Sequence, residues 1–81
     1  MKDIGEQIRK SRNSIKMTQQ ELADVIGKSV PSIQKYEIGA VTPPLNVLID
    51  IADALDVSIV KILKKVVSDD LKKHKAYSKR W

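Results

Sequence analysis

The segment from residue 18 to residue 39 most constrains the fold of this 81-residue chain, because it carries the signals of two short helices. Thr18 stands three residues before Glu21, a spacing typical of a capping box at a helix start. Gly27 is suited to end that helix, since glycine adopts a positive φ at little cost. Ser29 can cap a second helix, which has a proline in its first turn and ends near a glycine. The segment therefore predicts two helices joined by a tight turn.

Apolar residues in these two helices recur at helical spacing. The first helix places Leu22, Ala23 and Ile26 on one face, and the second directs Ile33 and Tyr36 inward. The outer side of the second helix is then free. In a helix–turn–helix, this second helix is the one that can enter the major groove of DNA.

A further helix is predicted before this segment. It begins near Asp3, which stands three residues before Glu6 as in a capping box, and it ends at about Ser14. Its inward face is expected to carry Ile4, Ile8 and Arg12.

Two more helices are predicted after the segment, and no strand is. Pro43 and Pro44 indicate a helix start. The buried stripe of that helix is expected to contain Leu45, Leu48, Ile49, Ala52 and Leu55. Ser58 can cap a fifth helix, whose apolar residues are Ile59, Ile62, Leu63 and Val66. The chain is thus predicted to be all-α, with a compact five-helix domain over residues 1–66 and a basic C-terminal extension over residues 67–81, which can continue as a helix from Ser68.

The net charge of +5 is unevenly placed along the chain. Residues 1–63 carry eight basic and eight acidic side chains, whereas residues 64–81 carry seven basic and two acidic ones. The excess positive charge therefore belongs to the C-terminal segment, which either binds an anion or stays solvated. The chain has no cysteine, no apolar run long enough to span a membrane and no apolar signal-peptide core. We expect a cytoplasmic protein that does not bind membranes.

The sequence offers no constellation for catalysis or metal binding. His74 is the only histidine, so a zinc site is not expected. Asp69 and Asp70 suit the first turn of a helix better than a catalytic carboxylate pair. The serines have no nearby base and the three glycines form no phosphate-binding loop. We therefore expect neither an enzyme nor a cofactor.

Short pieces of the chain, taken in order, resemble the phage repressor and Cro-like helix–turn–helix family over about residues 4–63. These pieces are IGEQIR at residues 4–9, TQQELA at 18–23, IG at 26–27, Ser29 with Ile33, YEIG at 36–39 and LNVLIDIA at 45–52. The resemblance implies five helices and a cytoplasmic DNA-binding regulator, commonly a dimer on a palindromic operator.

The resemblance also implies which residues contact DNA, namely Gln19, Val30, Pro31, Gln34 and Lys35. Lys28, Ser29 and Ser32, around the start of the second helix, complete the expected DNA-binding set, with solvated surface as the alternative for Lys28. Gln19 would touch a phosphate or brace a base-reading residue, its alternative being a plain surface glutamine. Gln34 can pair with adenine, while Lys35 can donate to guanine or to a phosphate. Val30 can contact a thymine methyl or pack over the helix start.

Other charged residues are expected to have structural or auxiliary roles. Arg12 and Glu37 occupy positions that form an ion pair in family members, and a buried guanidinium needs such a partner. Arg9, Lys10 and Lys16 are candidate phosphate contacts, with solvated surface as the alternative.

Three departures separate this chain from the family pattern. Ala40 and Val41 stand where basic residues often face a phosphate, although backbone N–H groups there could replace them. Lys16 and Asp56 stand where the family often has glycine, which predicts strain or a reshaped turn at both positions. In addition, the base-reading positions are unusually apolar.

The leading interpretation is a sequence-specific transcriptional regulator, a repressor, that binds double-stranded DNA as a homodimer. An alternative is an antitoxin-like or coactivator-like module whose DNA binding is secondary. That module would bind a protein partner through the C-terminal extension, which contains basic residues together with Tyr77 and Trp81.

Overall fold

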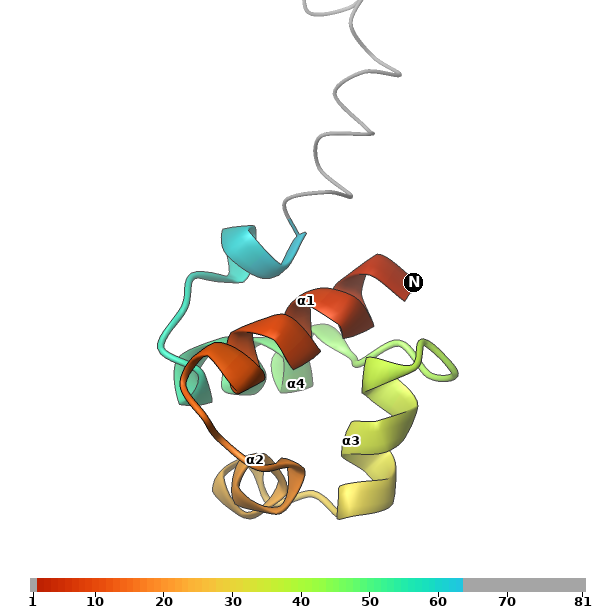
Figure 1. Cartoon of the computed structure of the whole chain (residues 1–81). Coiled ribbons are helices and arrows are strands. Elements are labelled where there is room, and N and C mark those ends of the chain that lie inside the picture. Colours follow the sequence, from red (N-terminus) through yellow and green to blue (C-terminus); the bar gives the residue numbers. More distant parts are fainter. Residues whose placement is uncertain (1, 64–81) are drawn as a thin grey trace, which may run out of the picture.

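The computed structural model describes residues 2–63, which form four helices and one further helical segment (Figure 1). The helices are α1 (Lys2–Ser14), α2 (Gln19–Ile26), α3 (Val30–Glu37) and α4 (Leu45–Ala54), and residues 59–63 are also helical. No strand occurs between residues 2 and 63, so the all-α prediction is confirmed. The predictions for Val66 and for the extension over residues 67–81 concern residues outside the described part.

The helices enclose one aliphatic core. α3 packs against both α1 and α2, and α2 also packs against α4. Figure 1 shows α2 nearly end-on below α1, and α3 upright at the right of the view. The buried apolar residues are Ile4, Ile8, Leu22, Ala23, Ile33, Tyr36, Val47, Leu48, Ile51, Ala52, Leu55 and Ile62. Burying such side chains is the main driving force for folding a domain of this size.

The caps that frame α2 and α3 are those predicted from the sequence. The Glu21 backbone N–H donates to Thr18 Oγ1 at 3.0 Å, and the Thr18 backbone N–H donates to Glu21 Oε1 at 2.9 Å. Gly27 ends α2 with φ of 68°, and the Ser32 N–H donates to Ser29 Oγ at 3.3 Å. These contacts satisfy helix-terminal groups locally and fix the short turn between the two helices.

Two helix ends use the left-handed conformation without glycine. Lys16 after α1 has φ of 58°, and Asp56 after α4 has φ of 55°. At each end the next residue closes the helix: the Met17 N–H donates to the Arg12 carbonyl and the Val57 N–H to the Ala52 carbonyl, both at 3.0 Å. The predicted strain at these two positions is thus present, at a cost of roughly 1–2 kcal/mol each.

The predicted capping box at Asp3 is wrong. α1 already includes Lys2, so Asp3 lies inside the helix and is not its N-cap. The Glu6 carboxylate instead lies 3.2 Å from the Lys10 ammonium, one turn further along α1. Such an i, i+4 pair stabilises an exposed helix slightly.

The predicted stripe of α4 is wrong in part. Leu48, Ala52 and Leu55 are buried, but Leu45 is 66% exposed and Ile49 is 52% exposed. Their places in the core are taken by Val47 and Ile51. The helix is therefore rotated about its axis relative to the prediction, and two large apolar side chains face outward.

Ser58 caps the last helical segment as predicted, since the Lys61 N–H donates to Ser58 Oγ at 3.2 Å. Ile62 is buried in the core, and Ile59 and Leu63 pack against it. Among the described residues, no helix has both the length and the apolar character needed to cross a membrane.

Candidate nucleic-acid interface

The two sides of α3 differ sharply in exposure. Ile33, Tyr36 and Glu37 are buried against the rest of the domain. Gln34 and Lys35, which stand between Ile33 and Tyr36 in the sequence, are exposed. Because a helix of eight residues makes little more than two turns, its outer edge presents only a few side chains. That edge is defined by Pro31, Gln34 and Lys35 and is called here the outer edge of α3.

The turn before α3 adds small and basic groups to this edge. Lys28 and Ser29 are exposed, while Val30 and Ser32 are half-buried. Val30 packs against the core, as in the structural alternative considered for it. The hydroxyls of Ser29 and Ser32 lie 3.1 Å apart, so the cap of α3 is itself part of this surface.

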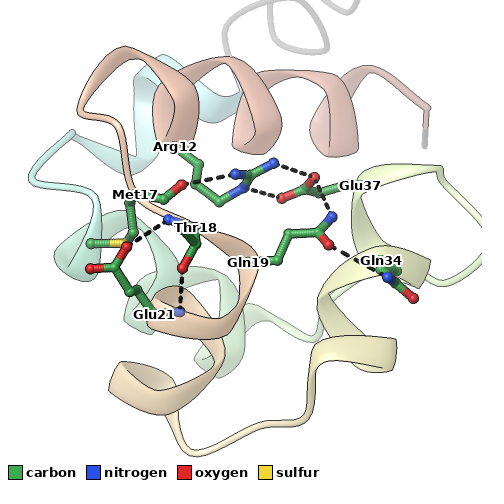
Figure 2. A network of polar contacts seen from close by, with 7 residues as sticks. All are labelled: Arg12, Met17, Thr18, Gln19, Glu21, Gln34 and Glu37. Carbon is green, nitrogen blue, oxygen red and sulfur yellow. Dashed lines mark hydrogen bonds and ion pairs between the residues drawn. The ribbon is translucent and has the colours of Figure 1, made fainter.

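A buried ion pair joins α1 to α3. The Nε and Nη2 groups of Arg12 donate to the two carboxylate oxygens of Glu37 at 2.7 and 3.0 Å (Figure 2). Arg12 Nη1 donates to the Met17 carbonyl at 2.8 Å, which fixes the turn between α1 and α2. The side chains of Arg12 and Glu37 are only 11% and 4% exposed. This fork geometry is the one in which a buried guanidinium and a carboxylate satisfy each other.

Gln19 connects this pair to the outer edge of α3. Its Nε2 donates to Glu37 Oε1 at 3.1 Å, and its Oε1 accepts from Gln34 Nε2 at 3.5 Å (Figure 2). The second contact is long and therefore weak. The Gln19 side chain is half-buried at the first residue of α2. A glutamine held in this way is placed to brace Gln34.

An open groove of about 510 Å³ runs along this network. Its lining residues are Glu6, Arg9, Gln19, Gln34, Glu37 and Ile38. Arg9 is exposed and lines the same groove as Gln19 and Gln34. Lys10, by contrast, is paired with Glu6, and Lys16 is exposed at the end of α1.

The loop after α3 offers less than the sequence suggested. The backbone N–H groups of Ala40 and Val41 both donate to the Lys35 carbonyl, at 3.0 and 3.2 Å. These two donors close the end of α3 and are not available to an incoming phosphate. The backbone N–H groups of Ala40 and Val41 therefore do not replace the phosphate contacts that basic side chains often make at these positions.

Gly5 is a packing position whose importance the helical pattern alone did not reveal. A Cβ atom at Gly5 would lie 2.2 Å from the Tyr36 carbonyl oxygen and 2.6 Å from that of Glu37. α1 can thus approach the end of α3 only because residue 5 has no side chain. The sequence did offer one signal, a glycine in the middle of a predicted helix. Glycine destabilises a helix interior by about 1 kcal/mol relative to alanine, so its presence there indicates a packing requirement.

The described residues contain no group of three or more His, Cys, Asp or Glu side chains arranged to hold a metal ion. The candidate surface combines amides, hydroxyls and lysines around the half-buried Gln19. Groups of these kinds can bind polyanions and base edges by charge and hydrogen bonding.

Comparison with known proteins decides the family. Residues 8–62 match the helix-turn-helix family. The chain belongs to this helix-turn-helix family. The transcriptional regulator YqaE of Bacillus subtilis is 40% identical over 75 residues, which cover 86% of this chain and 65% of that protein. The transcriptional repressor RstR of the cryptic phage CTXphi of Vibrio cholerae is 39% identical over 67 residues, which cover 83% of this chain and 60% of that protein.

This helix-turn-helix chain thus spans less than two thirds of the length of both relatives. Among solved structures, the restriction-modification controller protein C.AhdI of Aeromonas hydrophila matches with a TM-score of 0.72. That match is 23% identical and covers 75% of this chain and 92% of the other. It supports the five-helix fold.

Proposed function

We propose that this helix-turn-helix protein is a transcriptional repressor that binds double-stranded DNA as a homodimer and reads the major groove with α3. The family supports DNA binding, and a phage repressor is among the relatives. One observation carries the finer proposal: Gln34 and Lys35 are exposed while Ile33, Tyr36 and Glu37 of the same short helix are buried. Gln34 and Lys35 therefore project from the side of α3 that faces away from the core.

The residues of this face divide into two roles. Gln34 would pair with adenine and Lys35 would donate to guanine, because their side chains lie about one turn into α3. Lys28 and Ser29 would contact the phosphate backbone near the start of the helix, where N–H groups favour an anion. Arg9 would reach a neighbouring phosphate from the groove it lines.

Dimerisation is supported by the outward apolar face of α4. Leu45 and Ile49 are separated by one turn and are both more than half exposed. Exposed apolar side chains that adjoin one another are a common mark of a protein contact. Two copies would place their α3 helices in successive major grooves, about 34–36 Å apart.

The deciding experiment selects bound duplexes from a random pool at a stated salt concentration, since affinity for DNA depends steeply on salt. We expect an enriched palindromic motif whose half-sites are about one helical turn apart. Failure to enrich any motif, in a sample shown to be folded, would overturn the proposal.

Lys35→Ala then tests the role of α3 on the selected operator. We expect a loss of roughly 1–3 kcal/mol in binding and a relaxed preference at one base pair. The matched control is Lys61→Ala, because Lys61 is also exposed but lies in the 59–63 segment, across the molecule from the α2–α3 turn (Figure 1). An equal effect of both substitutions would mean that Lys35 contributes only general charge.

A further inference from the structure

We propose that the buried carboxylate of Glu37 determines which base Gln34 can recognise, by fixing the donor and acceptor directions of two glutamine amides. This inference rests on the proposed function, since it concerns the base that the outer edge of α3 reads. Glu37 would act through Gln19 and is therefore a positioning residue with no contact to DNA of its own.

The first step is the chemistry of the carboxylate. An ionised carboxylate accepts hydrogen bonds and cannot donate them. Glu37 Oε1 accepts from Arg12 Nη2 at 3.0 Å and from Gln19 Nε2 at 3.1 Å. Gln19 must therefore turn its NH₂ group toward Glu37, and its carbonyl oxygen must face the opposite way. Because the Glu37 side chain is only 4% exposed, water has little access to replace this partner.

The second step carries this direction to the surface. The outward oxygen of Gln19 lies 3.5 Å from Gln34 Nε2, and this weak contact favours the direction in which Gln34 turns its nitrogen toward Gln19. Figure 2 shows the Gln34 oxygen on the side away from Gln19. Gln34 is left with its oxygen and its second N–H for an outside partner. One acceptor beside one donor is the pattern that pairs with N6 and N7 of adenine.

The opposite direction would present a different pattern. If the Gln19 amide were reversed, its NH₂ group would face Gln34, and Gln34 would turn its oxygen inward. Gln34 would then offer only N–H donors to DNA. Two donors match the two acceptors of guanine, O6 and N7, and do not match adenine. The position of Glu37 and the hydrogen bonds that it accepts thus favour adenine over guanine at this position.

Glu37→Gln is designed to reverse the amides. Arg12 would still donate, and a glutamine at position 37 has one oxygen to accept this donation. Its NH₂ group would then face Gln19, which would turn its own oxygen inward and its nitrogen toward Gln34. We expect the preference for adenine over guanine at the base contacted by Gln34 to fall by roughly tenfold or more, which is within the range for one bidentate pair.

The measurement is competition between two operator duplexes that differ only by adenine or guanine at that base. Gln34→Ala on the wild-type operator first identifies the base, as the position where preference is lost. A purely structural role for Glu37 would weaken binding to both duplexes equally, whereas the proposal requires the ratio between them to change. Circular dichroism establishes that each variant is folded.

Gln19→Met provides a second variant, because Glu37→Gln removes the charge that balances Arg12 and could unfold the domain. Methionine leaves the ion pair intact but breaks the link to Gln34, so adenine and guanine should be bound within about threefold of each other. Gln20→Met is the matched control, since Gln20 is exposed on the same helix and donates to Asp24 only. It should keep the wild-type ratio.

The outcomes separate the two proposals. If wild-type protein enriches no motif, the proposed function fails. If a motif is enriched and Gln19→Met keeps the wild-type ratio of adenine to guanine, this inference is overturned while the function stands. The inference is equally overturned if folded Glu37→Gln keeps that ratio, or if Gln34→Ala changes no base preference.

Discussion

The contact between α1 and α3 and the outer edge of α3 lie on opposite sides of one short helix. At the inner contact, Gly5, Arg12 and Glu37 are all buried, and backbone approaches backbone closely. At the outer edge, Gln34 and Lys35 are exposed, and their bonds to the rest of the chain are few. We expect the inner contact to tolerate substitution less well than the outer edge, because buried charges and close-packed backbones depend on their partners. The contacts that stabilise the fold and the proposed DNA-reading side chains therefore lie on different faces of α3, and the Glu37–Gln19 hydrogen bond joins the two faces.

Arg12→Ala should have the largest effect at the inner contact. It leaves the Glu37 carboxylate buried without its partner, which we expect to lower the free energy of unfolding by about 3–5 kcal/mol. A loss of this size is a large fraction of the stability of a small domain. Urea denaturation followed by circular dichroism measures the free energy of unfolding of Arg12→Ala and of wild type.

The control for Arg12→Ala is Lys10→Ala, which removes the ion pair with Glu6 from the exposed face of the same helix. Exposed pairs contribute about 0–1 kcal/mol, so this variant should be nearly as stable as wild type. Similar losses for the two variants would contradict the contrast between buried and exposed faces.

Gly5→Ala should have the next largest effect. In an ordinary helix interior this change stabilises by about 1 kcal/mol, because alanine has the higher helix propensity. Here the new Cβ would meet the Tyr36 carbonyl oxygen at 2.2 Å, so α1 and α3 must separate. We expect a net loss of about 1–3 kcal/mol or more, seen as a lower thermal midpoint. Asn13→Ala, at an exposed position of α1, should instead leave the midpoint unchanged or raise it.

These two regions also differ in how well the sequence predicted them. The caps of α2 and α3 depend on residues three apart in the chain, so Thr18 and Ser29 could be assigned from local spacing alone. The approach of Gly5 to α3 depends on residues more than thirty positions away. Local residue spacing carries no information on a contact between residues so far apart in the chain. An isolated glycine within a helix indicated only that some close packing was required there.

The error in α4 has a different cause. Seven of its ten residues are apolar (LNVLIDIADA), so two overlapping stripes were both consistent with helical spacing. The polar residues Asn46, Asp50 and Asp53, which are all exposed, fall on one face and mark the side turned to solvent. Packing against α2 then buries the opposite side, which carries Val47 and Ile51. Tracing the polar stripe first would have placed Leu45 and Ile49 outside the core.

The network around Gln19 lies between these cases. The resemblance implied an ion pair between Arg12 and Glu37 and a bracing role for Gln19. In the structure, Arg12 and Gln19 both donate hydrogen bonds to Glu37. The direction of each amide could not be obtained from the sequence, because it depends on which atom of a distant partner donates. The DNA contacts of Lys28, Lys35 and the other surface residues remain predictions.

The smallest expected effects belong to the exposed start of α2. Thr18→Ala removes one cap acceptor and should cost about 1 kcal/mol of unfolding free energy, measured by urea denaturation at neutral pH.

The hydrogen bond from the Thr18 backbone N–H, aided by the Thr18 side chain, lowers the pKa of Glu21 below its ordinary value. A carboxyl whose pKa is lowered by folding stabilises the fold above its unfolded pKa, and this contribution is lost as the pH falls through the lowered value. Glu21→Gln keeps a capping-box residue that does not titrate in this range. As the pH falls from neutral to below the ordinary carboxyl range, wild type should therefore lose unfolding free energy relative to Glu21→Gln, as measured by urea denaturation at each pH. A difference that stays constant with pH would show that the capping box does not depend on the charge of Glu21.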